Sequence, residues 1–134
     1  MPDFLKILNP IFARIVCMHE FSIAQSIMQV VLHEADKARA RRVVKVTLNV
    51  GELAGVLPES LSFCFELLAK STIAENATLA INRVPIRARC SQCQVSFQVS
   101  DNRYLCPCCG KTAIELTSGR ELQIAHLEIE NETD

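Results

Sequence analysis

The chain has 134 residues, of which 49% are hydrophobic and 22% are charged, and its formal net charge is −1. This length suits one domain with a small appendage, and the composition is that of a globular protein that buries a core. A net charge so close to zero gives no general attraction for nucleic acid or an anionic membrane, so neither is expected as a partner.

The first 17 residues are apolar but are interrupted by three charged residues and by Pro10. They match neither a signal peptide nor a membrane span, which needs about 20 apolar residues. The seven cysteines are an odd number, which argues against a secreted disulfide framework. A cytoplasmic location is therefore expected. Residues 1–17 are interpreted as an N-terminal extension, and translation from Met1 or from Met18 stays open, with Met18 favoured.

Two amphipathic helices and a strand are predicted after the extension. Ser22 and Gln25 stand at capping-box spacing, and apolar residues at helical spacing follow to about Arg39. Val44, Val46, Leu48 and Val50 alternate with polar residues, which predicts a half-buried strand that Gly51 ends. Pro58 is well placed to begin the second helix.

The second half of the chain alternates in shorter segments. Leu79 and Ile81 predict a strand that ends near Pro85, and residues 121–130 predict the last strand. That last strand changes phase between Ile124 and Leu127, which indicates a bulge or burial on both faces. Residues 86–117 between these strands contain few large apolar side chains, so a segment this short needs a staple to hold it together.

Four cysteines in residues 86–117 provide that staple. Cys90 and Cys93 form one C-x2-C pair, and after twelve residues Cys106 and Cys109 form another. Each pair can direct two thiolates at one ion, and two pairs complete a tetrahedral sulfur shell of the kind that zinc prefers. Four protein ligands leave no open position for a substrate, so the zinc is predicted to be structural. Iron in the same shell is the alternative, because geometry alone does not exclude it.

The remaining cysteines and the histidines fit structural roles. Cys108 closes a chelate with Cys106 poorly and is interpreted as a spare thiol, Cys64 as a core residue and Cys17 as incidental. His33 falls on the polar side of the first helix, and His126 is expected to be a packed or edge residue of the last strand. A basic cluster is interpreted as a solvated helix end; it comprises Lys37, Arg39, Arg41, Arg42 and Lys45.

Five collinear motifs resemble the HypA/HybF nickel-incorporation proteins of hydrogenase maturation. They span about residues 18–130 in the family's order. These motifs are Met18-His19-Glu20-Phe21-Ser22-Ile23-Ala24, Val46-Thr47-Leu48-Asn49-Val50-Gly51-Glu52-Leu53, Pro58-Glu59-Ser60-Leu61 running into Phe63-Cys64-Phe65-Glu66, the two cysteine pairs, and Gly119-Arg120-Glu121-Leu122-Gln123-Ile124.

The resemblance implies a nickel metallochaperone, not an enzyme, that delivers Ni²⁺ to the large subunit of [NiFe]-hydrogenase. It also implies a HypB-type GTPase as a partner, with urease maturation proteins as further candidates. In that family the nickel site is the N-terminal Met-His-Glu, here Met18, His19 and Glu20. Nickel(II) prefers nitrogen donors, and an imidazole is neutral near pH 7. Some members add a carboxylate before the second helix; only Glu59 lies near that position here, and the role is not carried over to it.

The expected fold is α+β, with two helices packed on a small three-stranded sheet and an inserted four-cysteine zinc-ribbon-like module. Residues 18–85 with 118–134 are expected to form the nickel-binding domain and residues 86–117 the zinc-binding domain. The alternative function is a zinc-ribbon module that binds nucleic acid or protein, which basic residues near the cysteines favour and a scarcity of aromatic residues disfavours. No G-x-S-x-G elbow or phosphate loop supports an enzyme.

Overall fold

The computed structural model describes residues 18–131, so the predicted extension 1–17, with Cys17, lies outside the described residues. Two helices and six strands follow one another in this part of the chain. In order they are α3 (Met18–Lys37), β1 (Ala40–Gly51), α4 (Pro58–Ala69), β2 (Thr78–Val84), β3 (Arg87–Cys90), β4 (Ser96–Gln98), β5 (Ile114–Ser118) and β6 (Leu122–Asn131). The three longest strands form one sheet in the order β2-β1-β6, and the three short ones form a second in the order β4-β3-β5.

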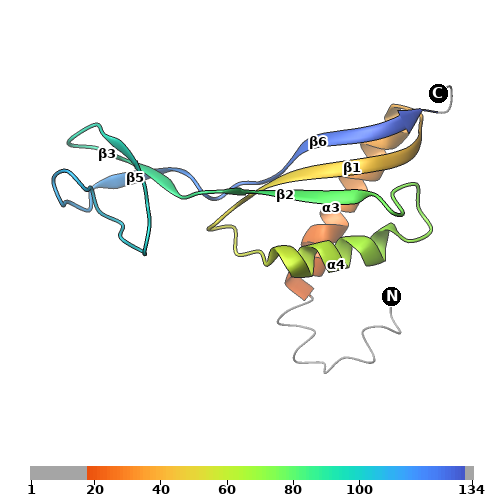
Figure 1. Ribbon diagram of the computed structural model, residues 1–134, viewed down its shortest axis with the longest axis horizontal. Coiled ribbons are helices and arrows are strands. Elements are labelled where there is room, and N and C mark those ends of the chain that lie inside the picture. Colours follow the sequence, from red (N-terminus) through yellow and green to blue (C-terminus); the bar gives the residue numbers. More distant parts are fainter. Residues whose placement is uncertain (1–17, 132–134) are drawn as a thin grey trace. The chain divides into compact units, whose positions relative to one another are not determined.

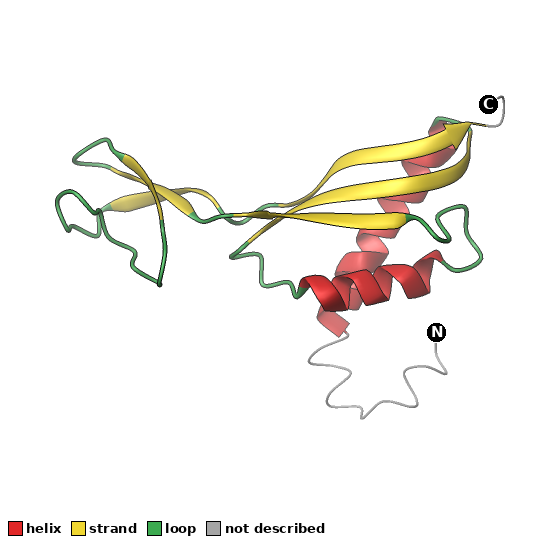
Figure 2. Cartoon of the chain, in the orientation of Figure 1, coloured by secondary structure: helices red, strands yellow, loops and turns green. Residues whose placement is uncertain are grey.

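Both helices lie on the same side of the sheet β2-β1-β6 (Figures 1 and 2). The predicted α+β class, with two helices against a small three-stranded sheet and an inserted four-cysteine segment, is confirmed. Strand β1 lies in the centre of its sheet because it carries the longest buried run, and strand β6, the last in sequence, completes the sheet beside it.

The chain divides into two compact units. Unit 1 comprises described residues 18–48, 56–81 and 124–131, and unit 2 comprises Asn49–Gly55 and Asn82–Gln123. The boundaries at 81/82 and 123/124 lie a few residues from the expected limits at 85/86 and 117/118, but Asn49–Gly55 falls in unit 2 although it was expected in the nickel-binding domain. The assignment of a nickel-binding and a zinc-binding domain stays a prediction. No helix among the described residues is long and apolar enough to cross a bilayer.

The core of unit 1 forms between the helices and the sheet. The helices bury residues at three- and four-residue spacing, and β1 buries alternate residues over part of its length, as expected for one inward face on each element. Its largest fully buried side chains are Phe65, Leu48, Leu61, Val31, Val43 and Val46. Cys64 is 2% exposed within this core, where the sequence placed it.

Helix α3 begins at Met18, four residues before the predicted capping box. Ser22 is not the cap, because it lies inside the helix, four residues after Met18. The prediction took the spacing of Ser22 and Gln25 as a helix start, although the same spacing also occurs inside helices. Because α3 begins at Met18, His19 and Glu20 lie in its first turn and not in a loop before it.

Strands β1 and β6 both contain a change of phase. In β1 Val43 is buried and Val44 is 37% exposed, so the predicted inward position of Val44 is wrong, while Val46, Leu48 and Val50 are buried as predicted. The N–H of Val43 donates to the carbonyl oxygen of Ile73 at 2.9 Å, which joins the start of β1 to the segment between α4 and β2. The phase change predicted for β6 falls at Ile124 and Ala125, which are both half-buried.

Unit 2 has a much smaller apolar core. Ile86, Ala88 and Val99 are its buried members, with four partly buried side chains packed against them. Strand β3 lies in the centre of the sheet and pairs antiparallel with both β4 and β5, so that Cys90 at its end lies opposite Ile114. A cluster this small agrees with the expectation that residues 86–117 need a further means of stabilisation.

Candidate metal centres

Four sulfur atoms converge at one end of the second sheet. The Sγ atoms of Cys90, Cys93, Cys106 and Cys109 all lie within 4.8 Å of one another. Cys90 and Cys106, the first member of each pair, are fully buried, while the second members are more exposed. These residues form a four-cysteine metal-binding cluster.

The two cysteine pairs have the same backbone fold. In the first, the N–H of Cys90 donates to the carbonyl of Val95 at 2.9 Å, and the N–H of Gln94 donates to the carbonyl of Cys90 at 2.9 Å. In the second, the N–H of Cys106 donates to the carbonyl of Lys111 at 2.9 Å, and the N–H of Gly110 donates to the carbonyl of Cys106 at 2.8 Å. Both hydrogen bonds recur at the same spacing from the first cysteine of each pair. Each pair therefore folds as one tight turn that directs both thiols toward the cluster.

The fourth residue after the first cysteine of each pair has a left-handed backbone conformation. Gln94 has φ 64° and Gly110 has φ 72°. Glycine adopts this conformation without a steric cost, whereas a residue with a Cβ is strained there. The sequence singled out Gly110 for this reason but gave no such signal at Gln94, whose side chain is held by Arg89 and by the carbonyl of Ser91.

Backbone N–H groups point at the sulfur of the first cysteine of each pair. Cys93 N–H points at the sulfur of Cys90 at 3.4 Å, and the N–H groups of Cys108 and Cys109 point at the sulfur of Cys106 at 3.4 and 3.5 Å. The N–H of Cys109 is the main cause that lowers the pKa of the Cys106 thiol to about 7, while the neighbouring Cys109 sulfur raises the pKa of Cys93 above its usual range. The lowered pKa of Cys106 favours the thiolate form, which is the form that binds a metal cation.

The spacing of the sulfurs fits a tetrahedral zinc ion. Four sulfurs at about 2.3 Å from zinc would lie about 3.8 Å from one another, and the Sγ atoms of Cys90 and Cys109 are 3.7 Å apart. Cys108 is exposed and is not a member of the four-sulfur cluster. Its N–H, rather than its thiol, is the group directed at Cys106.

The candidate nickel residues lie at the start of α3. The His19 side chain is 54% exposed, and its Nδ1 atom lies 3.3 Å from Oε2 of Glu20. The same carboxylate oxygen accepts a hydrogen bond from the backbone N–H of Leu57 at 3.3 Å. Met18 opens the helix. The site therefore combines an accessible imidazole with a carboxylate that is fixed by the residue preceding α4.

Glu20 is unusual for a carboxylate because it is only 3% exposed. Its second oxygen, Oε1, is buried and has no hydrogen-bond partner among residues 18–131. A buried carboxylate without full hydrogen bonding is costly and is typically compensated by a cation or another donor. The sequence did not reveal the contact with Leu57, because no local motif links residues 37 positions apart.

The remaining candidates do not join this site. His33 is exposed on α3, as predicted. His126 is exposed on the edge strand β6, so of the two roles expected for it the edge position is the one observed. Glu59 is exposed in the first turn of α4, and no described contact joins it to His19 or Glu20. The structure thus brings together His19, Glu20 and the backbone of Leu57.

The fold and the two sets of donors define a small metalloprotein with a closed sulfur cluster and a separate, accessible histidine. The family model described as "Hydrogenase/urease nickel incorporation, metallochaperone, hypA" matches residues 18–129. The chain therefore belongs to the HypA family of nickel metallochaperones. This assignment confirms the resemblance seen in the motifs.

Curated relatives extend over most of the chain. Hydrogenase maturation factor HypA of Geobacter sulfurreducens is 42% identical over 113 residues, which are 84% of this chain and 100% of the relative. Its namesake from Streptomyces avermitilis is 46% identical over 116 residues, which are 85% of this chain and 88% of the relative.

Solved structures show the same fold. The solution structure of the Ni metallochaperone HypA from Helicobacter pylori has a TM-score of 0.61 at 23% identity and covers 84% of this chain and 98% of its own. A second solution structure of a HypA protein has a TM-score of 0.67 at 23% identity, covering 86% and 98%.

Proposed function

We propose that this protein carries Ni²⁺ to the large subunit of [NiFe]-hydrogenase during its maturation, and that it is a carrier without turnover of its own. The observation that carries this proposal is the exposed His19 beside the buried Glu20 at the start of α3 in a chain of the nickel-incorporation family. Neither observation alone is sufficient, since an exposed histidine is common and family membership names no ligand.

Zinc is the metal that we assign to the four-cysteine cluster. Cys90, Cys93, Cys106 and Cys109 fill all four positions of a tetrahedral ion, so the metal has no free position for a substrate or for transfer. Its role is then to hold unit 2 in its fold. This leaves the second, accessible set of donors for the metal that is passed on.

Nickel is assigned to Met18, His19 and Glu20. A backbone amide nitrogen binds Ni²⁺ only after its proton is lost to solvent. The first N–H groups of a helix have no intrahelical partner, so in this turn that loss breaks no helical hydrogen bond. A chain that begins at Met18 would add its terminal amine and form fused chelate rings with the His19 nitrogens. The Glu20 carboxylate supplies negative charge next to the ion, with Oε2 3.3 Å from His19 Nδ1. A site with this much exposure can release its ion to a partner.

The test is a calorimetric titration of zinc-loaded protein beginning at Met18 with Ni²⁺. His19→Ala is expected to weaken nickel binding at least about tenfold, because it removes the imidazole donor. His33→Ala is the matched control, since it removes an exposed histidine from the same helix, and it should leave the affinity unchanged. Equal affinity of the His19 variant and the unsubstituted protein would refute the site.

Two further forms separate the contributions at this site. Glu20→Gln keeps an oxygen that accepts from Leu57 N–H but removes the charge, so a loss of affinity in this variant measures electrostatics and not loop geometry. The chain that retains residues 1–17 has a peptide nitrogen at Met18 instead of an amine, and it should bind nickel more weakly. Undiminished binding by the longer chain would remove the amine from the proposed shell.

The partners expected from the family are a HypB-type GTPase and the hydrogenase large subunit, with urease maturation proteins as further candidates. The family description names both hydrogenase and urease, which supports either client. Transfer of nickel from the loaded protein to immature hydrogenase, measured as recovered hydrogenase activity with and without His19→Ala, tests the hydrogenase assignment. The cytoplasmic location stays a prediction.

A further inference from the structure

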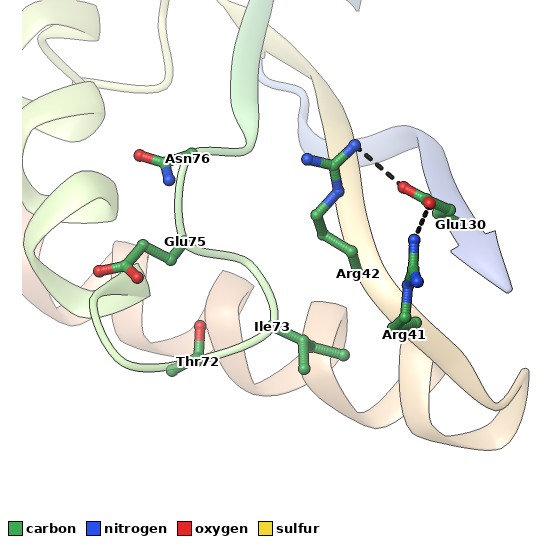
Figure 3. Close-up of a pocket in the computed structure, with 7 residues that line it drawn as sticks. All are labelled: Arg41, Arg42, Thr72, Ile73, Glu75, Asn76 and Glu130. Atoms are coloured by element: carbon green, nitrogen blue, oxygen red, sulfur yellow. Dashed lines mark hydrogen bonds and ion pairs between the residues drawn. The ribbon is translucent and has the colours of Figure 1, made fainter. Parts of the chain in front are cut away.

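A pocket lined by two arginines and two glutamates lies on unit 1 beyond the C-terminal end of α3. Its volume is 640 Å³, and it is lined by Arg41, Arg42, Thr72, Ile73, Glu75, Asn76 and Glu130 (Figure 3). These residues come from β1, from the segment between α4 and β2, and from β6. His19 is at the other end of α3, and 20 helical residues span about 30 Å, so the pocket is separate from the candidate nickel site.

Two adjacent arginines converge on one carboxylate in this pocket. Arg41 pairs with Oε1 of Glu130, and Arg42 lies 3.0 Å from Oε2 of the same group. Neighbouring residues of a regular strand point to opposite faces, so their convergence reflects the irregular start of β1, where the burial pattern also changes phase. The hydrogen bond from Arg41, followed by the charge of both arginines, lowers the pKa of Glu130, which is therefore ionised at neutral pH.

The arginines keep unused donors. Their side chains are 60% and 56% exposed, and each guanidinium has five N–H groups of which one meets Glu130. Arg39 and Lys45 add positive charge within residues 37–45, which contain no acidic residue, whereas Lys37 lies 3.7 Å from Oε1 of Glu34. The pair is thus an exposed clamp of the type that takes up carboxylates through guanidinium forks.

The opposite wall of the pocket offers little to a phosphate group. The backbone N–H groups of residues 72, 74, 75 and 77 already donate within the segment. The Thr72 hydroxyl donates to the carbonyl of Ala69 at 2.6 Å, so it is occupied too. A phosphate site is typically a cradle of several free backbone N–H groups, whereas four of the six in residues 72–77 are already used here. The hydrogen-bond donors that this pocket offers to an anion are therefore mainly side chains, namely the two arginines and the Asn76 amide.

Two other features of the wall restrict the ligand. Ile73 is 37% exposed and gives the pocket an apolar contact. Glu75 accepts a hydrogen bond from Ser71 N–H, and its carboxylate points away from the arginines in Figure 3, although its charge still opposes an anion. An extended peptide with spaced carboxylates can meet the arginines while keeping its charges away from Glu75.

We propose that the Arg41–Arg42 pocket is a docking site for an acidic, carboxylate-bearing segment of a partner protein. The partner's carboxylates join Glu130 in the arginine clamp, and an apolar side chain of the same segment rests on Ile73. Because docking occurs at the far end of α3, the His19 site stays accessible while the partner is bound. This inference does not depend on nickel binding, and His19→Ala should leave it unchanged.

The test uses the zinc-loaded full chain and a hexaglutamate peptide, followed by amide chemical shifts in nuclear magnetic resonance. The largest shifts are expected at Arg41, Arg42 and residues 73–76. The double variant R41Q/R42Q should bind at least about tenfold more weakly, because charge-assisted hydrogen bonds are lost. The double variant R103Q/R120Q is the matched control; it removes the same charge from exposed positions elsewhere and should bind as the unsubstituted chain does.

Two more measurements sharpen the result. Glu75→Gln should raise the affinity for hexaglutamate because it removes an opposing charge, and a fall would contradict the proposed geometry. Inorganic phosphate should bind more weakly than the peptide; equal or tighter binding would assign the pocket to phosphate and overturn the proposal. Absence of hexaglutamate binding, or equal loss in both double variants, would overturn it as well.

Discussion

The two units of this protein are stabilised by different means. In unit 1 large apolar side chains such as Phe65, Leu48 and Leu61 are fully buried between two helices and a sheet. In unit 2 the apolar cluster has three buried members, and the largest fully buried side chains are Val50, Cys90 and Cys106. A segment with this little apolar surface to bury is expected to need a metal ion, whereas unit 1 has a large apolar core of its own.

The largest expected effect is on unit 2 when its metal is removed. Structural zinc contributes about 10–16 kcal/mol in small zinc domains, which exceeds what three buried apolar residues supply. Chelation by EDTA should therefore collapse the amide dispersion of Asn82–Gln123 in nuclear magnetic resonance spectra while residues of unit 1 keep theirs. Cys106→Ser should act like chelation, because Cys106 is fully buried in the cluster.

Cys108→Ser is the control for that experiment. Cys108 is exposed and lies outside the four-sulfur cluster, so this variant should bind zinc with one equivalent per chain and keep its dispersion. Dispersed signals from unit 2 in the metal-free protein would show that packing alone holds this unit. Loss of zinc from Cys108→Ser would show that Cys108, and not Cys109, is the fourth zinc ligand.

A smaller effect is expected from a cavity in unit 1. Phe65→Ala removes a side chain that is 1% exposed and should lower the free energy of unfolding of unit 1 by about 3–5 kcal/mol. Zinc content should not change, because the substitution lies in the other unit. Chemical denaturation with a zinc assay measures both quantities. Phe63→Ala, at a position 43% exposed on the same helix, should cost clearly less.

The smallest effect distinguishes the two cysteine turns. Gly110→Ala places a Cβ at φ 72°, where no atom lies within 4 Å, so its cost is conformational and about 1–2 kcal/mol. This corresponds to roughly 5–30-fold weaker apparent zinc affinity in a competition assay. Gln94, at the equivalent position of the other turn, already has a Cβ, so Gln94→Ala should change the zinc affinity less. A larger loss at Gln94 would show that its bonds to Arg89 and Ser91 outweigh backbone strain.

Local patterns predicted most of the elements but not all their limits. Pro58 begins α4 as expected, because its fixed φ and missing N–H suit a first helical turn. The start of α3 was predicted too late, since a capping-box spacing carries no information about what precedes it. Val44 was assigned inward because the alternation was regular in sequence, but in the structure Val43 is buried in its place.

The sequence by itself determined the cysteine pairs, the α+β pattern and the motifs of the family, because ligand spacing and hydrophobic periodicity are local properties of the chain. Only the tertiary structure decided that Glu20 is buried against Leu57 and that Arg41 and Arg42 share Glu130. These contacts join residues 37 and more positions apart. They depend on how helices and strands pack, and packing is a property that no short stretch of sequence encodes.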